Sequence, residues 1–155
     1  MTRKEYSDEL ERALDRSDAW AMIQQIDDYA DYFASGAGDW PDELADDFEA
    51  IVTCHHDDPE KALAYVIIGA WRSDDPSFLG YLGCGPLEDV LRTPSVELLR
   101  RIVAEARRSA RFRWMLSNAF KVAIAEEAWE AIAKFRLTGP HEEPPDETLP
   151  PRQVN

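Results

Sequence analysis

The sequence contains few cysteines and no long apolar run. Cys54 and Cys84 are the only cysteines among its 155 residues, and they lie 30 positions apart without a paired spacing. Such usage is typical of the reducing cytoplasm. No apolar stretch approaches the ~18 residues that a helix needs to cross a bilayer, and the N-terminus lacks the apolar core of a signal peptide. These absences predict a soluble, cytoplasmic protein that makes no membrane contact.

Strand patterns and catalytic motifs are missing as well. No stretch alternates apolar and polar residues over the length of a strand, which predicts an all-α protein. No catalytic set, metal-ligand set or nucleotide-binding loop is present. The second absence favours a function other than catalysis, and it gives no reason to expect a cofactor.

Basic residues are scarce, and charge is unevenly spread. The chain has 17 Lys and Arg against 31 Asp and Glu, a formal net charge of −14. Residues 1–61 hold 18 acids and 5 bases, whereas residues 92–113 hold seven arginines and two glutamates. This balance argues against direct binding of nucleic acid or anionic lipid, because both would be repelled. It favours a basic protein partner.

Four prolines are almost evenly spaced along the helical part of the sequence. Pro41, Pro59, Pro76 and Pro94 are separated by 18, 17 and 18 residues. Each is suited to be the first residue of a helix, where its missing N–H costs nothing. Helices of about a dozen residues, joined by tight turns every ~18 residues, give a two-helix unit of ~35 residues, which is in the size range of helical-hairpin repeats. The predicted fold is a compact, irregular stack of short helices, built either as HEAT-like hairpins or as an orthogonal bundle.

Local signals mark further boundaries. Ser17 is expected to cap a helix that carries Asp18 in its first turn, and residues 35–38, Ser-Gly-Ala-Gly, are expected to end that helix through a glycine. Residues 111–136 have helical spacing, and both one helix and two helices remain open. Beyond residue 138 the composition shifts to proline and acid. We therefore expect one helical domain at 1–138 and a tail at 139–155 that is disordered or extended.

The stretch from Gly80 to Leu91 interrupts the helical pattern. Gly85 and Pro86 are expected to begin a new helix, which places Glu88 in its first turn as a partner for free backbone N–H groups. Cys84 would then lie at a helix N-terminus, where the pKa of its thiol should fall. Asp89 has no such explanation.

Residues 54–58, Cys-His-His-Asp-Asp, contain the common metal ligands. Neighbouring side chains on a helix point about 100° apart and rarely share one ion. His55 and His56 are therefore weak candidates, and no metal is expected.

Two surfaces are candidates for binding. One group of acids either forms a solvated helix face, which is the commoner case, or is dense enough to attract a basic partner. It comprises Asp27, Asp28, Asp31, Asp42, Glu43, Asp46, Asp47 and Glu49. The arginines either pair with acids inside the molecule, as Glu97 is spaced to do with Arg101, or form an anion site. The candidate partner-binding residues are Asp42, Glu43, Asp46, Asp47, Trp71, Arg72, Glu88, Asp89, Arg107 and Arg113.

Residues 82–91, Leu-Gly-Cys-Gly-Pro-Leu-Glu-Asp-Val-Leu, carry a resemblance. They resemble the Gly-x-Gly-Pro-Leu-Glu-Asp-x-Leu signature of an uncharacterised family of small bacterial helical proteins. The likeness continues downstream through Ile102, Ala106, Arg107, Phe112, Arg113 and Leu116. It implies a compact helical domain of bacterial origin, and it supplies no catalytic residues.

The sequence is therefore compatible with two alternative functions. The first is a non-enzymatic interaction domain with an acidic surface for a basic partner, similar to an immunity protein or another inhibitor. The second is a small-ligand-binding or enzymatic helical domain that uses the turn at 83–89 with neighbouring arginines. Neither the partner's identity nor the oligomeric state follows from the sequence.

Overall fold

The structure is a computed structural model that describes residues 6–36 and 38–152. These residues form helices and connecting turns, with no β-strand among them. The α-helices are α1 (Asp8–Leu14), α2 (Ala19–Ser35), α3 (Ala45–Thr53), α4 (Pro59–Arg72), α5 (Pro76–Leu82), α6 (Glu88–Arg92), α7 (Val96–Arg108), α8 (Ala110–Leu116) and α9 (Glu126–Ile132). The prediction of an all-α protein is confirmed.

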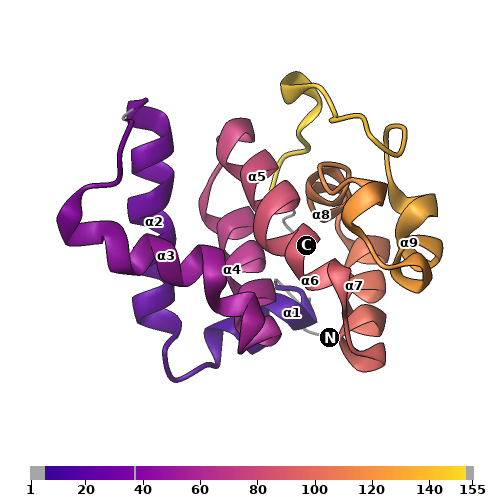
Figure 1. The fold of residues 1–155 in the computed structure, drawn as a ribbon, viewed down its shortest axis with the longest axis horizontal. Helices are drawn as coiled ribbons and strands as arrows, with labels where there is room; N and C mark the ends of the chain where they lie inside the picture. Colours follow the sequence, from indigo (N-terminus) through magenta and orange to yellow (C-terminus); the bar gives the residue numbers. More distant parts are fainter. Residues whose placement is uncertain (1–5, 37, 153–155) are drawn as a thin grey trace, which may run out of the picture.

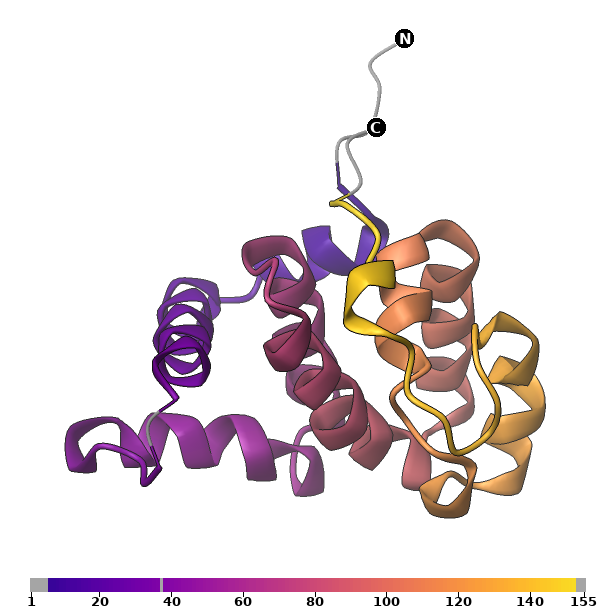
Figure 2. The ribbon, with the colours of Figure 1, turned by 90° about the horizontal axis from the view of Figure 1, so that it is seen from above.

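Helix α4 lies at the centre of the molecule. It packs against α1, α2, α3, α5, α6 and α8, and the remaining helices lie on either side of it (Figures 1 and 2). Its residues 62–69 are all buried. Asp58 caps the helix by accepting a hydrogen bond from the Lys61 N–H at 3.0 Å, and Pro59 is the first helical residue. One hydrophobic cluster extends from Leu10 in α1 to Ile132 in α9 through this centre.

The proline prediction is correct for two of the four positions. Pro59 and Pro76 begin α4 and α5, each behind a capping Asp. Pro41 instead precedes a short 3-10 helix, η1 (Asp42–Leu44). Pro94 precedes Ser95, whose hydroxyl caps α7 by accepting from the Leu98 N–H. The fixed φ of proline also suits the extended residue before a cap, so the capping side chain decides where α7 begins.

No new helix begins at Gly85 and Pro86, contrary to the prediction. The chain stays helical from α5 to α6, and the two are joined by a wider π-helical segment, η3 (Gly83–Leu87), that contains Pro86. A proline inside an α-helix lacks an N–H donor and its ring clashes with the preceding turn, and a locally widened turn relieves that conflict. Gly85 is therefore no cap, and Glu88 does not lie at a free helix N-terminus.

The boundaries of α2 differ from the prediction at one end. Gly36 closes the helix with φ of 67°, as expected for a left-handed C-cap. At the other end Asp18, rather than Ser17, occupies the N-cap position, and its side chain makes no capping bond. The Asp18 carboxylate instead accepts a hydrogen bond from Nε of Arg16 at 2.9 Å. A charged partner outcompetes the backbone for this carboxylate.

The segment at 111–136 contains two α-helices. Helices α8 and α9 are separated by a turn at Ser117 and Asn118 and by a 3-10 helix, η4 (Lys121–Ala123). Both turn residues are buried, and their side chains bond to backbone carbonyls of α8. These bonds satisfy the end of α8 and allow the chain to reverse.

The C-terminal residues 139–152 return across α8 to the start of α5 (Figure 1, yellow). Arg136 holds the beginning of this segment through hydrogen bonds to the carbonyls of Leu116 and Gly139, at 3.2 and 2.6 Å. Pro144 is buried, and Leu149 packs against the hydrophobic cluster. Residues 153–155 of the predicted tail lie outside the described residues.

Candidate functional site

Helices α2 and α3, with η1 between them in the chain, lie at one side of the molecule (Figure 2). These elements carry an acidic surface. Residues 17–60, which form these elements, contain 13 Asp and Glu and no Lys or Arg. We define the acidic α2–α3 surface by residues Asp31, Asp42, Glu43, Asp46, Asp47 and Glu49. All except Asp47 are exposed. Within the described part of the chain, none of the six forms an ion pair with Lys or Arg.

An aromatic cluster holds the two helices of this surface together. Tyr29 of α2 stacks on Phe48 of α3 with ring centroids 4.3 Å apart and planes at 11°. Trp40 meets both rings edge-on. The Gln25 side chain also donates to the Asp47 carboxylate at 3.3 Å, from α2 to α3. Stacked and edge-on aromatic pairs add to the free energy of burial, so the cluster fixes the positions from which the acids project.

Trp20 was missed by the sequence interpretation. It lies in the first turn of α2 and is 82% exposed. Because Met22, Ile26 and Tyr29 define the buried face of α2, helical spacing places Trp20 and Asp31 on the opposite face. This spacing could have identified the residue. An exposed Trp is a favourable anchor for Arg or Lys.

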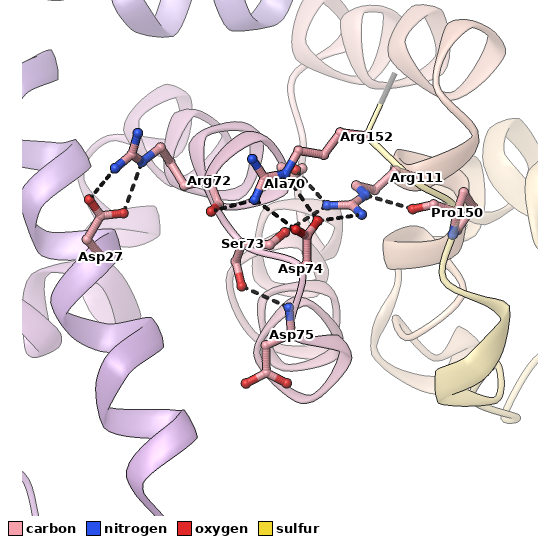
Figure 3. A network of polar contacts seen from close by, with 9 residues as sticks. All are labelled: Asp27, Ala70, Arg72, Ser73, Asp74, Asp75, Arg111, Pro150 and Arg152. Atoms are coloured by element: carbon pink, nitrogen blue, oxygen red, sulfur yellow. Dashed lines mark hydrogen bonds and ion pairs between the residues drawn. The ribbon is translucent and has the colours of Figure 1, made fainter. Parts of the chain in front are cut away.

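Trp71 and Arg72 lie at the end of α4, at the edge of the acidic surface. Arg72 donates two hydrogen bonds to the Asp27 carboxylate, at 3.0 and 2.7 Å, and so joins α4 to α2 (Figure 3). Its guanidinium group lies over the Trp71 ring, 5.4 Å from the centroid. Trp71 also meets Tyr6 edge-on. Both candidate residues thus have contacts inside the molecule.

Glu88 and Asp89 have different hydrogen-bond partners, and Arg92 lies within ion-pair distance of both carboxylates. The Glu88 carboxylate accepts a hydrogen bond at 2.8 Å from the N–H of Phe120, the residue before η4. Glu88 therefore stabilises a distant turn, which corrects the prediction that it satisfies the start of its own helix. Asp89 accepts from Nε of Arg92 at 3.3 Å and lies 3.6 Å from Nδ1 of His55.

The cysteine prediction also requires correction. Burial raises the pKa of the Cys84 thiol, and the nearby Glu88 carboxylate raises it further. No helix N-terminus exists at Cys84 to oppose these effects, because the helix is continuous there. Burial also raises the pKa of Cys54, to about 11. Within the described residues, no group of three or more His, Cys, Asp or Glu could hold a metal ion, at His55 and His56 or elsewhere.

The arginines of α7 and α8 make contacts inside the molecule. Arg101 pairs with Glu9 of α1 and Glu60 of α4, so the expected partnership with Glu97 is wrong. The tertiary fold offers Arg101 a buried acid, with which hydrogen bonds are stronger than with an exposed helical neighbour. Arg113 donates to the carbonyl of Ala106 at 2.8 Å, and Arg107 is exposed in the last turn of α7. Neither is hydrogen-bonded to Glu88 or Asp89 in the described contacts.

These observations define an all-helical protein with an acidic surface on its N-terminal helices. None of the helices in the described residues combines the length and apolar character of a membrane span. The chain belongs to a family of unknown function, DUF6869, which matches residues 39–139. The match includes η1, α3 and all helices from α4 to α9, whereas α1, α2 and the segment after Gly139 lie outside it. No curated protein and no solved structure matches the chain significantly.

Proposed function

We propose that this protein is a non-enzymatic bacterial interaction protein that binds a basic protein through the acidic α2–α3 surface. The observation that carries the proposal is the absence of Lys and Arg from residues 17–60, together with the exposure of five of the six defining acids. Because none of the six acids forms an ion pair with a Lys or Arg of the described residues, their negative charge is not neutralised within that part of the molecule. The surface therefore has a negative electrostatic potential. That field speeds encounter with a partner of opposite charge.

Trp20 adds a means of tight contact to this field. Charge alone speeds association and sets specificity more than it adds affinity, whereas buried aromatic residues and arginines supply most of the binding energy. An exposed Trp on the outer face of α2 can receive an Arg or Lys side chain of the partner over its ring. The surface thus offers both steering and an anchor.

The specific form of the proposal is an inhibitor similar to an immunity protein. An enzyme that acts on nucleic acid carries a basic surface, and an acidic protein of this size can cover such a surface. The contacts of Glu88 and Asp89 are internal, so they add no support to the alternative of a ligand site at residues 83–89.

Charge reversal with a matched control tests the proposal. The variant carries Asp42→Lys, Glu43→Lys, Asp46→Lys and Asp47→Lys. The control carries Glu126→Lys, Glu127→Lys, Glu130→Lys and Glu143→Lys, four exposed acids outside the acidic surface that change the net charge equally. Both sets include two acids in the first turn of a helix, so both lose a similar interaction with a helix dipole.

Proteins retained from extracts of the native host are identified for the wild type and for both variants. We expect a basic protein to be retained by the wild type and the control and lost by the α2–α3 variant. The purified partner should bind the wild type more weakly as salt rises from ~0.05 to ~0.3 M, because exposed charges are screened. An identical set of retained proteins for all three chains would contradict the proposal.

A further inference from the structure

The last described residues of the chain lie in a seat formed by α4, α5 and α8. We define the tail seat by residues Asp74, Pro76, Arg111 and Trp114. A pocket of about 620 Å³ there is bordered by Asp74, Pro76 and Arg111 on one side and by the C-terminal segment on the other. The seat lies inside the family match at 39–139, and the segment that fills it lies outside.

Two donors of the seat contact the segment directly. The Trp114 indole N–H donates to the Thr148 hydroxyl at 3.1 Å. Arg111 donates from Nε to the Pro150 carbonyl at 2.9 Å (Figure 3). Leu149, between these two contacts, packs against the hydrophobic cluster. The seat therefore contacts a hydroxyl, an apolar side chain and a proline carbonyl in succession.

An ion pair completes the contacts at the end of the segment. Arg152 donates from Nε and Nη2 to the two oxygens of Asp74, at 3.1 and 3.0 Å. Its Nη2 also donates to the Arg72 carbonyl at the end of α4, at 3.0 Å. Figure 3 shows Arg111 and Arg152 meeting at Asp74. A bidentate pair of this kind selects arginine over lysine by geometry.

The body of the protein holds the two donors in place independently of the segment. Arg111 is 5% exposed. Its other nitrogens donate to the carbonyls of Ala70 and Ser73 and to Asp74, at 3.1, 2.7 and 3.0 Å. Trp114 is 1% exposed. Three hydrogen bonds to the body thus aim Nε of Arg111 at the segment, and Trp114 is a buried residue of α8.

The segment has the chemistry of a proline-rich ligand. Pro145 has φ of −61° and ψ of 144°, which is the polyproline II conformation. Pro150 and Pro151 lack N–H groups and can be recognised only through their carbonyls and rings. Between these prolines the chain forms a short 3-10 turn, η6 (Asp146–Thr148). The prolines fix φ on both sides of this turn, so binding of the segment costs less conformational entropy.

The segment is a poor match for the seat in one respect. It carries Asp146 and Glu147, both exposed, and Asp146 borders the same pocket as Asp74. Arg111 and Arg152 neutralise Asp74 locally, but the chain as a whole, whose formal charge is −14, repels both acids at long range. A segment with basic residues at these two positions would remove the repulsion and add attraction.

We propose that the tail seat recognises a segment of a partner protein with the pattern Thr-Leu-Pro-Pro-Arg preceded by basic residues. The chain's own residues 148–152 occupy the seat as an intramolecular ligand until such a partner displaces them. A tail from a second copy is not the occupant. It carries the same acids, and it competes with a tail already present at an effective concentration of roughly millimolar.

The test uses two synthetic peptides derived from residues 145–152. The first carries Asp146→Lys and Glu147→Lys. The second is a matched control that carries these changes and also Arg152→Glu. The hosts are the full-length wild type and a full-length variant with Leu149→Asp and Arg152→Glu, which frees the seat by changing only the tail. Thermal unfolding of the variant confirms that the body remains folded.

Fluorescence anisotropy measures binding of each labelled peptide. We expect the first peptide to bind the variant at least ~10-fold more tightly than it binds the wild type, because the internal competitor is lost. The control peptide should bind the variant ~10-fold more weakly than the first, because it loses the pair with Asp74. Equal binding of the two peptides to the variant would overturn the proposal.

A second measurement needs no variant. Hydrogen exchange of residues 146–149 is followed in the wild-type chain with an excess of each peptide. The first peptide should accelerate this exchange several-fold by displacing the tail, and the control peptide should not. An exchange rate that an excess of the first peptide leaves unchanged would also overturn the proposal.

Discussion

At the scale of single residues, the notable group is the carboxyl of Glu105. It lies on α7 against the start of α1 and is 8% exposed. Burial raises the pKa of Glu105 to about 7. The Ser7 hydroxyl and Arg108 oppose this rise, whereas Glu9 and Asp8 add to it. The folded protein therefore keeps a proton that the unfolded chain loses near its ordinary pKa of 4.5.

This difference predicts that Glu105 destabilises the fold as pH rises. Below pH 4.5 the group is protonated in both states and carries no penalty, whereas above pH 7 the folded state must hold a buried charge. Glu105→Gln should therefore gain stability over the wild type with rising pH, up to about 3 kcal/mol at ~pH 8. Urea denaturation of both proteins at ~pH 5 and ~pH 8 measures the gain.

A control distinguishes this effect from a general effect of charge. Glu97→Gln removes an exposed acid from the same helix and should keep the wild-type dependence on pH. If Glu105→Gln differs from the wild type by the same amount at both pH values, the carboxyl does not titrate as proposed.

At the scale of elements, the segment from α5 to α6 is the least regular helix. Its π-helical part passes close to α8. A Cβ atom at Gly83 would overlap the carbonyl oxygen of Met115 and lie 3.0 Å from Cβ of Asn118. The sequence predicted an interruption at this place, but the glycine serves a close helix–helix approach rather than a helix end.

Replacing this glycine should separate the two helices. We expect Gly83→Ala to cost about 1–3 kcal/mol, because the backbone of α8 cannot move without disturbing the core. Gly85→Ala is the matched control. Its Cβ would meet Tyr81 at 3.6 Å, an ordinary contact, and its effect should stay within about 0.5 kcal/mol. Chemical denaturation measures the free energy of unfolding of both variants. Equal losses of stability would contradict the close approach of Gly83 to α8.

At the scale of the whole molecule, stability is concentrated in the centre. Helix α4 is buried along residues 62–69 and touches most other helices. The C-terminal segment has few buried side chains, since Pro144 is the one buried residue among 139–152. Regions with few buried contacts open locally at low cost, whereas a central helix opens only with the entire fold.

Hydrogen exchange should therefore separate the two regions. Amides of α4 should exchange last, with a free energy of opening that equals the free energy of global unfolding from denaturation. Amides of residues 146–149 should exchange at least ~100-fold faster, which corresponds to about 3 kcal/mol less protection. Mass-spectrometric exchange on the full chain provides both values. Equal protection of the two segments would show that the tail is part of the cooperative core.

Much of the fold could be predicted because its determinants are local. Apolar spacing identified the helical segments, Gly36 marked the end of α2, and Asp-Pro pairs marked the starts of α4 and α5. Each signal acts within about one helical turn, so no distant residue is needed to interpret it. Pro94 and Ser17 gave wrong helix starts because the next residue in each case, Ser95 or Asp18, occupies the N-cap position.

The candidate site was only partly predictable. The acids at 42–47 are exposed on η1 and α3 as their density indicated, with Asp47 partly covered. Glu88 was assigned to its own helix, yet its partner Phe120 lies 32 residues away. The arginines of residues 92–113 were expected either to pair with acids inside the molecule or to form an anion site, and Arg111 pairs with Asp74 beneath the C-terminal segment. Contacts over such separations leave no pattern in the sequence.

The sequence by itself determined the helical class, several helix boundaries and the unequal distribution of charge. Short-range backbone preferences and composition decide these properties, and they are the same in every fold that the chain could adopt. Only the tertiary structure decided which charges are neutralised. Arg101 and Arg111 pair with acids from other parts of the fold, and Asp27 of α2 pairs with Arg72, whereas the six acids of the acidic α2–α3 surface form no ion pair with Lys or Arg within the described residues. The reason is that pairing depends on which helices pack together, and that in turn depends on burying the apolar faces around α4.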